Sequence, residues 1–166
     1  MRTTILLMAL LVTGCSLPTY DVEAVYRPLE RIKESPLRPG DGITTVGVTA
    51  WVNDLENWLK KHPSGSPVYR AILMHEREHT VRQLAYGLRP WLKRYLTDTD
   101  FMRDEELRGW YIQIQEYRRR GLQPNPEGIA KVLAGYRNIV GQMISYEDAL
   151  RWVQDVLSGR WTPPAE

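Results

Sequence analysis

Apolar residues recur every three or four positions through most of the chain, the spacing that places them on one face of a helix. The longest such segment runs from Val68 to Tyr86 and stops at Gly87. The pattern predicts helices over residues 21–33, where Pro28 interrupts the spacing, and over residues 53–61, 68–86, 91–96, 101–120, 127–136 and 145–157. Only Ile43 to Val52, which is rich in β-branched residues, predicts a strand. We therefore expect a mainly α fold with a minor β element (α+β), in a single domain over residues 21–166.

Polar residues at the ends of these segments support the predicted helix boundaries. Ser145, followed by an acid three residues later, has the pattern of a helix start. Thr99 or Asp100 is expected to cap the helix that begins at Phe101. Pro126 suits the first position of the helix that follows, because proline lacks the N–H that would otherwise be unpaired there.

The N-terminus has the features of a bacterial lipoprotein signal. Arg2 precedes an eight-residue apolar run, Ile5 to Val12, which is too short to span a bilayer as a helix. The run leads into Val-Thr-Gly-Cys, which resembles a lipobox, and Cys15 is the only cysteine in the chain. We predict a signal peptide over residues 1–14, lipid on Cys15 and a short tether over residues 15–20. An ordinary secretory signal is the alternative.

These features predict a location in the cell envelope, with the domain facing the periplasm or the outside. Lipid on Cys15 would hold the protein to a membrane without spanning it. The formal net charge is +2, and removal of residues 1–14 takes away one arginine and no acid, which leaves +1. A chain this close to neutral has no basic surface field of the kind that binds nucleic acid, so we expect no nucleic-acid partner.

The sequence HEREH, residues 75–79, lies within the longest predicted helix. Residues four apart on a helix differ by about 40° around the axis and about 6 Å along it, so His75 and His79 can meet at one metal ion. Neutral imidazole is a common zinc ligand. Glu76 follows the first ligand, where a carboxylate can take a proton from a metal-activated water. H-E-x-x-H on a helix therefore predicts two zinc ligands and a general base.

A catalytic zinc site needs a third protein ligand. No H-x-x-G-x-x-H continuation follows His79, and His62 lies in a predicted loop, so a carboxylate on the helix over 101–120 is the better candidate. The candidates on that helix are Asp104, Glu105, Glu106 and Glu116. Its apolar face is set by Leu107, Trp110, Tyr111 and Ile114. Glu106 borders that face, whereas Glu105 lies roughly opposite it, so we predict Glu106 as the third ligand and Glu105 as the alternative.

Glu106 also opens a Glu-x-x-Gly sequence, in which Gly109 lets two helices approach closely. The segment Ile72–Gln83, the aromatic stretch with Trp91, and FMRDEELRGWYIQ from Phe101 together resemble small bacterial HExxH proteins of the gluzincin type. The resemblance covers about residues 43 to 118. It implies a zincin-like helical domain in which a glutamate on the second helix completes the zinc site.

The motif and the resemblance predict a membrane-anchored zinc metallopeptidase that acts on a peptide or protein substrate in the envelope. A non-catalytic zinc-binding or structural lipoprotein is the alternative, and a third interpretation makes HEREH a solvated helix face. A further side chain usually helps to stabilise the transition state of such a reaction. The sequence does not choose among the candidates Tyr111, Tyr136, Arg137 and Tyr146.

Overall fold

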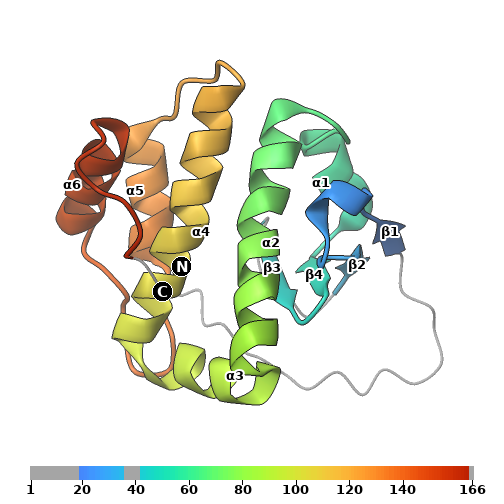
Figure 1. Ribbon diagram of the computed structural model, residues 1–166, viewed down its shortest axis with the longest axis horizontal. Coiled ribbons are helices and arrows are strands. Elements are labelled where there is room, and N and C mark those ends of the chain that lie inside the picture. The colour runs from blue at the N-terminus through green and yellow to red at the C-terminus, as the bar shows by residue number, and fades with distance from the viewer. Residues whose placement is uncertain (1–18, 36–41, 165–166) are drawn as a thin grey trace.

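The computed structural model describes residues 19–35 and 42–164 (Figure 1). The predicted signal peptide and Cys15 lie outside these residues. The strands are β1 (Thr19–Asp21), β2 (Arg31–Glu34), β3 (Ile43–Val46) and β4 (Thr49–Val52). The helices are α1 (Leu55–Lys61), α2 (Pro67–Tyr86), α3 (Leu88–Thr97), α4 (Thr99–Arg119), α5 (Pro126–Gly135) and α6 (Tyr146–Leu157). The prediction of a mainly helical α+β fold is confirmed.

The small sheet has the strand order β1-β2-β4-β3. The pair β2–β4 is parallel, and the pairs β1–β2 and β3–β4 are antiparallel. The prediction of one strand over residues 43–52 is wrong, because Gly47 has a φ of +62° and reverses the chain into a hairpin. Thr19 and Tyr20, assigned to the tether from sequence, belong to β1.

The predicted helix over residues 21–33 is wrong. This segment contains a short 3₁₀ turn at Ala24–Tyr26 and then β2. Pro28 explains the difference, because it lacks an N–H and clashes with the preceding turn of a helix. The apolar residues Leu29 and Ile32, whose spacing suggested a helix, are fully buried in the core beside the sheet.

Side-chain caps fix the helix starts. Ser145 accepts a hydrogen bond from the Asp148 N–H at 3.1 Å, as its position predicts. The cap of α4 is neither Thr99 nor Asp100 but Asp98, whose carboxylate accepts from the Phe101 N–H at 2.9 Å. The helix starts at Thr99, two residues before the predicted start at Phe101, so the cap precedes both predicted residues.

Helix α2 lies in the middle of the molecule, between α4 on one side and the sheet with α1 on the other (Figure 1). Two apolar clusters flank it. One joins the sheet, α1 and the first half of α2, and the other joins α4, α5 and α6. Nearly all of the buried polar side chains among the described residues belong to α2 or α4, and they include both histidines of HEREH. None of the helices in the described ranges is long and apolar enough to cross a membrane.

Candidate metal centre

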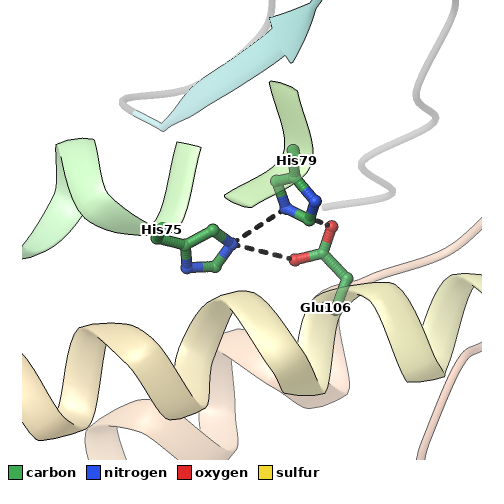
Figure 2. Close-up of side chains that lie close together, drawn as sticks. All are labelled: His75, His79 and Glu106. Atoms are coloured by element: carbon green, nitrogen blue, oxygen red, sulfur yellow. Dashed lines mark hydrogen bonds and ion pairs between the residues drawn. The ribbon is translucent and has the colours of Figure 1, made fainter. Parts of the chain in front are cut away.

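His75 and His79 on α2 and Glu106 on α4 converge at one point between the two helices (Figure 2). The two Nε2 atoms lie 3.0 Å apart. Glu106 Oε2 is 3.7 Å from His75 Nε2, and Glu106 Oε1 is 3.4 Å from His79 Nε2. All three residues are at most 5% exposed, which excludes the interpretation of HEREH as a solvated helix face. We call these three residues the His–His–Glu site.

The spacing of these atoms fits a tetrahedral zinc ion. Ligand atoms about 2.0–2.1 Å from such an ion lie roughly 3.3 Å from one another. The distance of 3.0 Å between the two nitrogens and that of 3.7 Å from Glu106 Oε2 to His75 Nε2 lie on either side of that value. Glu106 Oε2 is buried and has no hydrogen-bond partner among the described residues. A buried carboxylate oxygen without a partner is costly, and a metal ion would satisfy it.

The orientation of His75 is fixed from α4. Its Nδ1 lies 2.9 Å from Gln113 Oε1, and Gln113 Nε2 donates to the Tyr117 hydroxyl at 2.7 Å. Because the amide nitrogen is engaged by Tyr117, the amide oxygen faces His75 and accepts from Nδ1–H. This leaves Nε2 with its lone pair toward His79 and Glu106, the tautomer that a metal ligand needs.

Gly109 makes the close approach of α2 and α4 possible at this point. A Cβ atom at this position would lie 2.5 Å from both Cδ2 and Nε2 of His75. The expectation that a small residue in Glu-x-x-Gly allows two helices to approach agrees with this contact. Trp110 covers the next side of the ring, edge-on with centroids 5.6 Å apart.

Glu106 is held by a residue that sequence reasoning missed. The Tyr95 hydroxyl, on α3, donates a hydrogen bond to Glu106 Oε1. Burial and then the negative charge of Glu106 raise the pKa of Tyr95 well above its usual value, so its phenol stays protonated. Tyr95 lies on a different helix from Glu106, so no helical spacing links it to the third ligand.

Glu76 is buried and lies toward the sheet side of α2. The Thr45 hydroxyl on β3 donates to Glu76 Oε2 at 2.7 Å. Gln83 fixes the same hairpin, since it accepts from the Gly47 N–H at 2.7 Å and donates to the Thr45 carbonyl at 3.0 Å. The edge strand β3 therefore sets the position of the predicted general base.

Glu105, the alternative third ligand, is engaged elsewhere. It is fully buried, its two oxygens lie 2.8 Å from the donating Arg82 Nε–H, and Oε2 also accepts from the Trp91 indole N–H at 3.0 Å. Glu105 was placed opposite the apolar face of its helix, but that side is not exposed, because α2 and α3 cover it and supply its partners. Trp91 also packs edge-on against His79, with centroids 6.0 Å apart.

The other predicted ligand candidates lie away from the His–His–Glu site. Asp104 is exposed, and Glu116 pairs with Arg119 and Arg120 at the end of α4. Glu116 is buried as well. His62 packs against Trp58, with ring centroids 4.9 Å apart.

Of the four candidates for stabilising a transition state, only Tyr136 is placed near the carboxylates of the His–His–Glu site and Glu76. Burial, followed by the charges of Glu106 and Glu76, raises the pKa of Tyr136 well above its usual value. Tyr111 packs on Trp161 with centroids 5.6 Å apart, Arg137 is exposed, and Tyr146 packs against the cluster of α4, α5 and α6.

Electrostatics couple the three residues to one another. Burial disfavours the charged form of His75, but Glu106 and the charge of Glu76 outweigh it and raise the pKa of His75 above its usual value. Burial likewise disfavours the Glu106 carboxylate, yet the charges of His79 and His75 lower its pKa to about 2. Glu106 therefore stays ionised at neutral pH, as a metal ligand requires.

The chain matches no protein-family model, no curated protein and no solved structure.

Replacing Gln113 by leucine should weaken zinc binding by about 10- to 100-fold, the usual effect of losing a group that orients a ligating histidine. The variant keeps the bulk of the side chain but frees the His75 ring to rotate and to change tautomer. Zinc affinity measured by competition with a chromophoric chelator would show this. Gln154→Leu, on the exposed face of α6, is the matched control, and equal affinities of the two variants would contradict the assignment.

Zinc affinity should fall as the pH falls from about 8 to about 5, because protons compete for the imidazole nitrogens. The pKa of His75 is raised, so weakening should begin above the ordinary histidine value of about 6.5. Glu106, with a pKa of about 2, stays ionised throughout and contributes nothing to the slope. Competition titrations at several pH values test this, and a constant affinity over the range would exclude histidine ligation.

Proposed function

We propose that the protein is a zinc-dependent metallopeptidase that lipid on Cys15 holds at the cell envelope. In this proposal His75, His79 and Glu106 bind zinc, and Glu76 is the general base. The zincin-like character of the α2–α4 pair is part of the same proposal. It would hydrolyse peptide bonds in envelope proteins or in peptidoglycan peptides. The domain would face the periplasm or the outside.

One observation carries the proposal: three buried side chains of the right chemistry converge with zinc-like spacing, and a carboxylate follows the first of them directly. Two imidazoles and one carboxylate are the protein ligands of a known class of catalytic zinc site, which leaves one position for water or substrate. Zinc in such a site activates water and polarises the carbonyl of the scissile bond.

The residues of the chain divide the remaining tasks. Thr45 engages Glu76 Oε2, so Oε1 is the oxygen that would accept the proton of the attacking water. Glu76 would then deliver that proton to the amine nitrogen as the C–N bond breaks. The protonated Tyr136 hydroxyl, close to Glu106 and Glu76, would donate a hydrogen bond to the developing oxyanion.

A second function, zinc binding without catalysis, is favoured by the depth of the site. Its three ligands and Glu76 are all at most 5% exposed, which leaves little ligand surface in contact with solvent. In that case the ion would join α2 to α4 and stabilise an envelope lipoprotein that acts through its surface.

Hydrolysis of a quenched fluorogenic peptide library by the full chain separates the two functions. The peptidase proposal predicts cleavage that a chelator abolishes and added zinc restores. Stoichiometric zinc with no cleavage of the library, or of purified peptidoglycan peptides, would leave the non-catalytic function. Cleavage that survives complete removal of the metal would contradict both.

A further inference from the structure

The two carboxylate oxygens of Glu106 have different surroundings. Oε1 accepts the hydrogen bond from the Tyr95 hydroxyl and lies 3.4 Å from His79 Nε2. Oε2 is buried without a hydrogen-bond partner among the described residues and lies 3.7 Å from His75 Nε2. The carboxylate is thus divided between one oxygen bound to the protein and one oxygen left for a further partner.

Tyr95 is itself held rigidly. Its ring stacks on Trp91, with centroids 4.6 Å apart and planes 15° from parallel. Trp91 is in turn fixed by donating to Glu105, which Arg82 also binds. The stack of Tyr95 on Trp91 and the contacts of Glu105 therefore join α2, α3 and α4 and hold the Tyr95 ring in place beside Glu106.

The backbone of α3 is also anchored where Tyr95 lies. The Asn138 side chain donates to the Tyr95 carbonyl at 3.2 Å, and the Ile139 N–H donates to the Leu96 carbonyl at 3.2 Å. The segment after α5 thus holds the end of α3 from outside. Because both the ring and the backbone of Tyr95 are held, its hydroxyl can keep one oxygen of Glu106 in place with little further loss of conformational entropy.

We propose that Tyr95 is a positioning residue that restricts Glu106 to binding a metal through one oxygen, Oε2. The inference rests on the proposed zinc site and adds to it the residue that sets how the third ligand binds. A carboxylate can bind a cation through one oxygen or two. With Oε1 held by the phenol, the protein contributes one ligand atom from each of three residues and keeps a position for water or substrate.

The test is the cobalt-substituted full chain, whose visible absorption reports the number of ligands because four-coordinate cobalt absorbs more strongly than five-coordinate cobalt. Tyr95→Phe keeps the ring stack on Trp91 and removes only the hydroxyl. We expect its cobalt band to weaken and shift as the second oxygen of Glu106 enters. Tyr111→Phe, which removes a hydroxyl from a ring packed on Trp161, should keep the wild-type spectrum.

In a second variant, Tyr95→Met, a different side chain without a hydroxyl replaces the tyrosine, and its spectrum should match that of Tyr95→Phe. Circular dichroism verifies that each variant folds. Cobalt binding with a wild-type spectrum in a folded Tyr95 variant would overturn this inference and leave the zinc site standing. If the wild-type chain bound neither cobalt nor zinc, the proposed function would fail and this inference with it.

Discussion

Glu76→Gln should lower peptide hydrolysis by roughly 10²- to 10⁴-fold while leaving the bound zinc unchanged. Glutamine has the size of glutamate and can still accept from Thr45, whose hydroxyl lies 2.7 Å from Oε2. It cannot take a proton from water at neutral pH, so only the proton transfer is lost. Rates with the quenched peptide library and elemental analysis of the same preparation measure the two quantities together.

Glu78→Gln is the matched control, because it makes the same change two residues further along α2 at a position outside the His–His–Glu site. It should keep both zinc and activity. Two results would count against Glu76 as the general base. One is full activity in Glu76→Gln, and the other is a loss of zinc as large as the loss of activity, which would make Glu76 a support of the metal site.

Gly109→Ala should reduce zinc binding more than any substitution outside the three ligands. The added methyl group would lie 2.5 Å from His75 Nε2, well inside van der Waals contact, so the ring or the helix must move. At a zinc concentration that saturates the wild type, we expect less than about a tenth of the sites to be filled, because ligand atoms must lie within a few tenths of an ångström of their places.

Gly135→Ala provides the control, since a Cβ atom there meets nothing within 4 Å. Both glycines lie in helices, where alanine is favoured by up to about 1 kcal/mol. A loss of zinc in Gly109→Ala therefore could not be assigned to weakened helix formation. Equal zinc affinity in the two variants would show that α2 and α4 do not need their close approach to bind metal.

Much of the arrangement could be predicted from sequence because α2 and α4 are long and clearly periodic. The four-residue spacing of His75 and His79 placed both on one face, and the border position of Glu106 directed it toward α2. The structure brings these three residues together. Their assignment as zinc ligands, like the role of Glu76, remains a prediction.

Glu105 and Gln113 show where periodicity failed. Apolar periodicity identifies the buried side of α4 only by its apolar residues, but α4 also buries polar side chains against α2 and α3. Gln113 follows Glu106 by seven residues, two helical turns, so a search for polar residues at helical spacing would have found it. A carboxylate such as Glu105 can be fully buried when a partner like Arg82 neutralises it.

Tyr95 and Thr45 could not have been predicted by such a search. Each reaches its carboxylate from a different element, α3 or β3, and their approach depends on how those elements pack. The sequence pattern also missed the strands β1 and β2, which are only three and four residues long. Strands this short contain too few residues for an alternating pattern to be distinguished from a broken helix.

The metal content of the purified full chain tests the central claim most directly. Elemental analysis should find about one zinc per chain in the wild type and in His62→Ala, and almost none in His75→Ala. His62 is the matched control because it is the one histidine outside HEREH and packs on Trp58 instead. An absence of zinc from the wild type, even after reconstitution with excess metal, would contradict the account and leave His75, His79 and Glu106 as a buried ionic cluster.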